Sequence, residues 1–154
     1  MISLQKSRQM VGGLVVATIV ALAGGCGGPY DAAVTGVITI DNAPVPRGTV
    51  KFLPQQAGPP GYGLIGSDGS YEVMTGRERG LQSGSYVVTV VANEESIPNP
   101  EPSLPPRPGK PITPPWYRIP AQSPLKFTVE PGSNEIDLDL SSQPPAGWNP
   151  GRRP

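Results

Sequence analysis

The stretch PLKFTVEPGSNEIDLDL (residues 124–140) alternates apolar with polar side chains along both of its halves. A period of two is the spacing of a β-strand, because successive side chains of a strand point to opposite faces. The stretch therefore predicts two strands with one buried face each, joined by a hairpin turn within VEPGSN. Its apolar positions are Leu125, Phe127, Val129, Ile136, Leu138 and Leu140.

Five upstream segments have the same character. They are rich in β-branched and aromatic residues and are separated by clusters of turn-forming residues. Asp68-Gly69, which joins two of them, is typical of a two-residue hairpin. No segment after Leu22 shows the 3.6-residue period of an amphipathic helix, so essentially no helix is expected. The segments are AVTGVITID (33–41), GTVKFLP (48–54), GYGLIGS (61–67), SYEVMTG (70–76) and SYVVTVVA (85–92).

Together these segments predict an all-β domain, an antiparallel seven-stranded β-sandwich over residues 33–140. The most apolar segment, residues 85–92, is expected at the centre of a sheet with both faces covered. The expected core consists of Val34, Ile38, Val50, Phe52, Tyr71, Val73, Tyr86, Val88, Val90, Leu125, Phe127, Val129, Ile136 and Leu138.

Proline interrupts this pattern. The chain has 20 glycines and 22 prolines, so much of it must be turn or loop, and 11 of the prolines lie between Ile97 and Pro124. Because proline lacks an N–H group and fixes φ, residues 97–124 are expected to leave the sandwich as an extended insert with polyproline II character. Residues 141–154, also rich in proline and glycine, predict a disordered tail.

The first 26 residues indicate where the chain is located. Lys6 and Arg8 precede a short apolar run, residues 10–22, which is followed by Ala-Gly-Gly and Cys26. A basic start, a short apolar core and small residues before a cleavage point form a secretory signal peptide. The run is about 13 residues long, too short to cross a ~30 Å hydrocarbon core as a helix.

A cysteine directly after the small residues resembles the cleavage box of bacterial lipoproteins. This resemblance implies that residues 1–25 are removed and that Cys26, lipidated, becomes the new N-terminus, followed by a tether over residues 26–32. Gly27 stands where an aspartate would resemble an inner-membrane retention signal, which favours the outer membrane. The expected location is the cell envelope, periplasmic or at the cell surface, with the membrane as a partner. A plain secreted protein and an uncleaved anchor remain the alternatives.

Composition excludes several classes of function. The chain has no histidine, and Cys26 is its only cysteine, so the commonest general base and a thiolate metal site are missing. Without Lys6 and Arg8, 10 basic residues face 12 acidic ones, a balance that gives no electrostatic footprint for nucleic acid. We therefore expect no catalytic residue, no cofactor and no nucleic-acid partner.

Several fold-forming positions resemble one family. Gly36 in the first strand, the Pro44-Val45 turn, the Asp68-Gly69 hairpin and the Gly-x-Tyr that enters the strand at Tyr86 are similar to the carboxypeptidase-regulatory-like domain, a transthyretin-like β-sandwich. The resemblance implies a non-catalytic accessory or adhesion-like module. Transthyretin-like hydrolases use histidines and a C-terminal Tyr-Arg-Gly-Ser, whereas this chain has no histidine and ends in GRRP.

The candidate interaction surface lies in the insert and consists of Arg107, Lys110, Trp116 and Tyr117. LPPRPGKP (104–111) is similar to a polyproline ligand with basic residues beside it, although a stiff spacer is the simpler interpretation. Trp116 and Tyr117 form either an aromatic contact patch or a return of the insert onto the core. Envelope proteins are the partners considered first.

Two other functions remain as alternatives. A carbohydrate-binding module would use exposed aromatic residues, and a metal- or carboxylate-dependent enzyme would need converging acids. Glu135, Asp137 and Asp139 lie two residues apart on one strand face, about 7 Å from each other, and do not converge alone. A solvated outer face is therefore expected there, without a metal. The available aromatic residues are Tyr62, Trp116, Tyr117 and Trp148.

Overall fold

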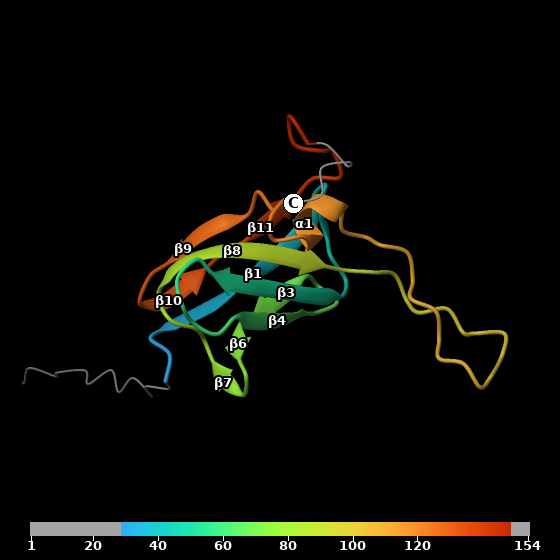
Figure 1. Cartoon of the computed structure of the whole chain (residues 1–154), viewed down its shortest axis with the longest axis horizontal. Helices are drawn as coiled ribbons and strands as arrows, with labels where there is room; N and C mark the ends of the chain where they lie inside the picture. The colour runs from blue at the N-terminus through green and yellow to red at the C-terminus, as the bar shows by residue number, and fades with distance from the viewer. Residues whose placement is uncertain (1–28, 149–154) are drawn as a thin grey trace, which may run out of the picture.

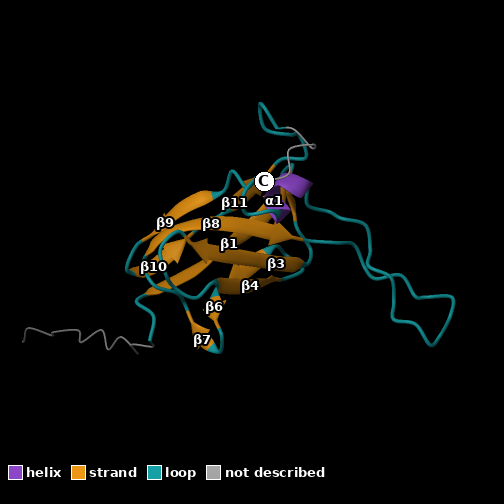
Figure 2. Ribbon diagram, in the orientation of Figure 1, coloured by secondary structure: helices purple, strands orange, loops and turns teal. Residues whose placement is uncertain are grey.

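A computed structural model describes residues 29–148 and shows two β-sheets packed face to face (Figures 1 and 2). The predicted all-β sandwich is confirmed. The predicted signal peptide, Cys26 with the next two residues of the predicted tether, and residues 149–154 lie outside the described residues. Within the described part of the chain, no helix is long and apolar enough to cross a membrane.

The first sheet is built around one long strand, β1 (Ala32–Ile40). Antiparallel β2 (Ala43–Pro44) and β5 (Ser70–Glu72) pair with one edge of β1. β10 (Gly132–Glu135) and β11 (Leu138–Leu140) pair with its other edge and run parallel to it. The expectation of a purely antiparallel sandwich is therefore wrong at this edge.

The second sheet has six antiparallel strands. β8, the strand expected at a sheet centre, is indeed flanked on both sides, by β3 and β9. In order across the sheet the strands are β7 (Glu78–Arg79), β6 (Met74–Thr75), β4 (Gly61–Ile65), β3 (Gly48–Pro54), β8 (Gly84–Val91) and β9 (Lys126–Val129).

Both predicted hairpins connect different sheets. The turn at Asp68-Gly69 leads from β4 in the second sheet to β5 in the first, and the turn at residues 130–131 leads from β9 to β10 in the same way. The turn residues are as expected, since Gly69 has a φ of +83°. Local turn chemistry predicted the reversal of the chain but not the sheet that the next strand joins.

The described residues form eleven strands, whereas seven were expected. Two predicted strands are each divided in two, at Val73 between β5 and β6 and at residues 136–137 between β10 and β11. At the second break the N–H of Val37 donates to Oδ1 of Asp137 at 2.8 Å, so a side chain replaces the backbone acceptor of the ladder.

The core lies between the two sheets and matches the sequence expectation closely. Every predicted core residue is buried except Leu125 and Phe127, which are partly buried because they lie on or beside the edge strand β9. Several core residues from strand ends, from turns and from the insert were not predicted. They are Ala32, Val45, Ile65, Leu81, Ala92, Trp116, Tyr117 and Leu140.

The insert has two parts with different structures. Residues 94–110 form an arm that extends away from the sandwich (Figure 1), with its two legs joined between Ile97 and Arg107 by two backbone hydrogen bonds of 2.9 Å. Residues 111–124 return along the end of the sandwich and contain α1 (Pro115–Arg118), a four-residue helix that the sequence did not predict. Pro115 at its first turn lacks only an N–H that a helix leaves unpaired there.

The described part of the predicted C-terminal tail contacts the sandwich. Residues 141–148 were expected to be disordered, but the N–H of Ser141 donates to the hydroxyl of Tyr117 at 3.0 Å, and that of Ser142 to the carboxylate of Asp41 at 3.1 Å. Trp148 packs against Trp116, with ring centroids 4.8 Å apart. This segment is therefore part of the folded body.

Candidate functional site

The two legs of the arm are joined to each other at its base, and one ion pair connects the base to the sandwich. The N–H of Glu94 donates to the carbonyl of Lys110 at 2.8 Å, and Arg47 forms an ion pair of 2.6 Å with Glu95. Gly109 lies against the opposite leg so closely that a Cβ atom there would overlap the carbonyl oxygens of Glu94 and Glu95. Only glycine fits at this point, so the two legs leave the body as a joined pair.

The tip of the arm is ordered by one asparagine. The side chain of Asn99 donates to the carbonyl of Pro105 at 3.2 Å and accepts from the N–H of Glu101 at 3.3 Å. The N–H of Leu104 donates to the carbonyl of Glu101 at 3.0 Å and closes the turn. Leu104 is 50% exposed, so the tip presents an apolar side chain to solvent.

Two of the four predicted interaction residues are exposed and could contact a partner. Arg107 and Lys110 are exposed on the returning leg of the arm, and neither has an ion-pair partner among the residues that the structure describes. Prolines flank both cations, at positions 105, 106, 108 and 111. An extended, proline-stiffened segment loses little conformational entropy when a partner binds it.

The other two predicted interaction residues are not on the surface. Trp116 and Tyr117 are only 5% and 6% exposed and pack at the end of the sandwich next to β8 and the C-terminal segment. The contact-patch interpretation is therefore wrong, and the return of the insert onto the core is correct. The indole N–H groups of Trp116 and Trp148 are buried without a hydrogen-bond partner in the described structure.

The burial of these rings also removes most of the surface that a carbohydrate would need. Of the four aromatic residues considered for sugar stacking, Trp116 and Tyr117 are buried and Trp148 is partly buried. Tyr62 remains, 43% exposed, and its ring lies 5.0 Å from Nζ of Lys51.

The acidic row, Glu135, Asp137 and Asp139, lies at the edge of the first sheet, where two of its carboxylates bond to β1. Asp137 accepts from the N–H of Val37, and Asp139 accepts from the hydroxyl of Thr39 at 2.6 Å. The side chain of Glu135 is exposed. Within residues 29–148 there is no group of three acids that could hold a metal ion together. The predicted solvated face is the role that this geometry supports.

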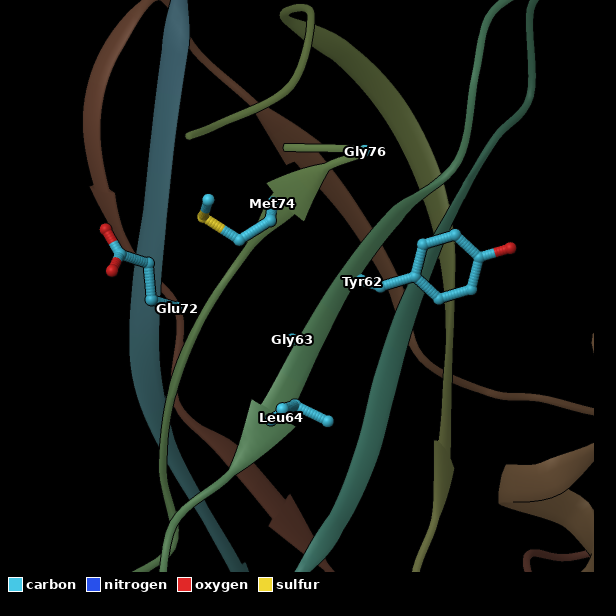
Figure 3. Close-up of a pocket in the computed structure, with 6 residues that line it drawn as sticks. All are labelled: Tyr62, Gly63, Leu64, Glu72, Met74 and Gly76. Atoms are coloured by element: carbon cyan, nitrogen blue, oxygen red, sulfur yellow. The ribbon is translucent and has the colours of Figure 1, made fainter. Parts of the chain in front are cut away.

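A groove on the second sheet was not predicted. It has a volume of about 430 Å³, is open to solvent, and lies beside β4 and β6 (Figure 3). Its lining consists of Tyr62, Gly63, Leu64, Glu72, Met74 and Gly76. Arg79 forms an ion pair with Glu72 at its rim.

The sequence signal for this groove is an inverted alternation in β4. In GYGLI the small residues Gly61 and Gly63 point into the core, and the large residues Tyr62 and Leu64 point outward. A Cβ atom on Gly61 would lie 2.6 Å from the side chain of Val73, and one on Gly63 would lie 2.9 Å from that of Val50, so these two inner positions leave no room for a side chain. Leu64 is 81% exposed as a result, the most of any large apolar residue described.

The comparisons with known proteins found no relative. No protein-family model, no curated protein and no solved structure matches this chain.

Proposed function

We propose that the chain is a lipid-anchored, non-catalytic protein of the cell envelope that binds other envelope proteins through its proline-rich arm. The observation that carries this proposal is the arm itself. Its two legs are joined at Glu94 and Lys110, and Glu95 forms an ion pair with Arg47 of the body. Its tip is ordered by Asn99, and Leu104, Arg107 and Lys110 are left exposed. A projection that buries little of its own surface contributes little to the core and is suited to contact a partner.

The anchor part of the proposal rests on the sequence. The basic start, the short apolar run and Cys26 support a lipid anchor in a membrane, and Gly27 favours the outer membrane. Treatment of producing cells with globomycin, which blocks lipoprotein processing, should leave a larger precursor. Mass spectrometry of the untreated protein should find an acylated Cys26 as the first residue. An unchanged mobility, or a free thiol in an intact chain, would refute the anchor.

The two-sheet fold is compatible with a non-catalytic domain of the transthyretin-like type. We propose that the two sheets correspond to the sandwich of the carboxypeptidase-regulatory-like domain, with the short strands β2, β6 and β7 as additions to its framework. The absence of histidine from the sequence and the use of Asp137 and Asp139 as hydrogen-bond acceptors for β1 favour binding over catalysis.

The arm can be tested in the full-length protein in its own cells. A photo-cross-linking residue at position 104 should give a discrete adduct, and the same residue at Thr128, exposed on β9, should not. Arg107→Glu should weaken the adduct at position 104, and Arg77→Glu, in an exposed turn of the body, should leave it unchanged. No adduct at position 104, or equal adducts from both positions, would refute the arm as the binding element.

A further inference from the structure

Charge is divided between the two sheets. The strands of the first sheet contain Glu72, Glu135 and Asp139 and no lysine or arginine, and Asp137 lies between two of these strands. Four strands of the second sheet, β3, β4, β8 and β9, contain Lys51 and Lys126 and no aspartate or glutamate. The remaining strands of the second sheet, β6 and β7, add one acidic and one basic residue, Glu78 and Arg79. Glu72 lines the groove beside the second sheet, where Arg79 pairs with it. The first sheet is therefore acidic, and the outer face of the second sheet is weakly basic.

The basic face is also the apolar face. Lys51 is in register with Tyr62, and Thr49 with Leu64, so these side chains share the outer surface of the second sheet. Met74 pairs with Tyr62 and extends this surface to the groove. We call this outer surface, with Lys51, Tyr62, Leu64, Met74 and Lys126, the docking face. An exposed apolar patch bordered by cations is typical of a surface that contacts anionic lipid, and tyrosine is enriched at membrane interfaces.

The chain that precedes the described residues limits how far one end of the sandwich can lie from a bilayer. Asp31 is fixed to the body because its carboxylate accepts from the N–H and the hydroxyl of Ser83, both at 2.7 Å. Ser83 directly precedes β8 of the second sheet, and Asp31 itself directly precedes β1 of the first, so this point lies at one end of both sheets. Asp31 is five positions after Cys26, so the lipidated cysteine lies at most ~18 Å from this point. That reach is short compared with β1, whose nine residues span ~30 Å.

We propose that the docking face lies on the anionic membrane surface that holds the lipid anchor, with the acidic first sheet turned to water. This inference rests on the proposed lipid anchor, which raises the local lipid concentration enough for a weak face to bind. Lys51 and Lys126 approach lipid phosphates, and Tyr62 and Leu64 enter the headgroup region. The acidic row of the first sheet disfavours the opposite orientation, because an anionic surface repels it.

The test uses two exposed positions on opposite faces. Thr128 lies on β9 in register with Ser85, on the outer side of the second sheet, and Glu135 lies on β10 in register with Thr35, on the outer side of the first. The turn at residues 130–131 joins the two strands, so both positions lie near the same end of the molecule. In the lipidated protein Cys26 is blocked, and a cysteine introduced at either position is the only free thiol.

The purified full-length lipoprotein, carrying a fluorophore at Thr128→Cys or Glu135→Cys, is placed in phosphatidylcholine vesicles with added phosphatidylglycerol and a lipid that has a nitroxide on its headgroup. We expect quenching several-fold stronger at position 128 than at position 135. Omitting phosphatidylglycerol or raising the salt concentration should reduce this difference. Lys51→Glu combined with Leu64→Asp should abolish it, and Leu104→Asp, the same change on the arm, should leave it intact.

Equal quenching at the two positions, or stronger quenching at position 135, would overturn the docking face. Flotation of the vesicles separates this failure from that of the anchor. A chain that floats with the vesicles and shows equal quenching refutes only the docking face, whereas a chain that does not float refutes the anchor and the docking face together. The thermal midpoint of the Lys51→Glu, Leu64→Asp variant should stay close to that of the unaltered protein, because both substitutions lie on the outer surface.

Discussion

Gly36 lies directly against the backbone of Ile136, and a Cβ atom at Gly36 would overlap the carbonyl oxygen of Ile136 and lie 2.6 Å from its carbonyl carbon. This contact sits at the gap between β10 and β11, where the parallel ladder with β1 is interrupted. The N–H of Ile136 donates to the carbonyl of Thr35 at 2.8 Å, and the N–H of Val37 donates to Asp137. At this interruption the backbone is closely packed, and the residues on both sides of Gly36, Thr35 and Val37, each form a hydrogen bond across the gap.

Gly36→Ala should therefore destabilise the protein. The added methyl group must displace the backbone of either β1 or residue 136, and we expect a loss of about 3 kcal/mol, the upper end of the usual cost of overpacking. Denaturant unfolding of the purified protein measures this loss. Gly58→Ala is the matched control, since its Cβ atom would meet neighbours only at 3.5 Å and beyond. Equal stability of the two variants would contradict the close contact.

The same carbonyl is held from the core side by Tyr71. Its hydroxyl donates to the oxygen of Ile136 at 2.6 Å, and burial, with a smaller contribution from the charge of Asp137, raises the pKa of Tyr71. Tyr71→Phe leaves a buried carbonyl without this donor and should cost about 1–2 kcal/mol. Tyr62→Phe, on the exposed face, should cost much less. A loss of similar size in both variants would show that the Tyr71 hydroxyl contributes nothing specific.

The strands and most of the core could be predicted from the sequence, because alternation is a local pattern. In β9 and β11, for example, period two places Val129 and Leu138 correctly in the core. The sheet that each strand joins is not a local property. β10 runs parallel to β1 because the chain crosses between sheets at residues 130–131, and the turn residues alone would equally suit a hairpin.

The candidate site could be predicted only in part, for the same reason. Arg107 and Lys110 are exposed as expected, because closely spaced prolines keep this segment out of a sheet. Trp116 is buried because it meets Trp148, 32 positions later in a segment expected to be disordered. The sequence counts Tyr62 among the aromatic residues available at the surface but assigns Leu64 to no face, although the inward glycines of β4 leave both side chains no other side.

Stability should fall in acid through carboxylates that accept hydrogen bonds in turns. Hydrogen bonds from the hydroxyl and N–H of Ser83 lower the pKa of Asp31, and Ser70 and Ser142 lower the pKa values of Asp68 and Asp41 in the same way. A pKa lowered by folding stabilises the native state above the ordinary value of 3.8. That stabilisation is lost as the pH falls below about 4 and through the lowered folded values.

Asp31→Asn should therefore lower the thermal stability at neutral pH and make it fall less steeply as the pH is lowered. Thermal midpoints measured from pH 7 down to about pH 2 give the profile. Ser83→Ala, which removes the hydroxyl donor, should act in the same direction, and Ser133→Ala, at an exposed position of β10, should not. An acid dependence that is identical in the Asp31 variant and the unaltered protein would contradict the role of this pair.

The C-terminal segment should stabilise the end of the sandwich through Trp148. Trp148→Ala removes the edge-to-face contact with Trp116, and we expect a loss of about 2 kcal/mol, below the ~3–5 kcal/mol of a fully buried tryptophan because Trp148 is only partly buried. The substitution also leaves Trp116 as the only tryptophan, so its fluorescence emission should shift to longer wavelength as its environment opens to water. Leu104→Ala, on the arm, is the control and should change neither measurement. Unchanged stability and emission in the Trp148 variant would return residues 141–148 to the disordered tail that the sequence predicted.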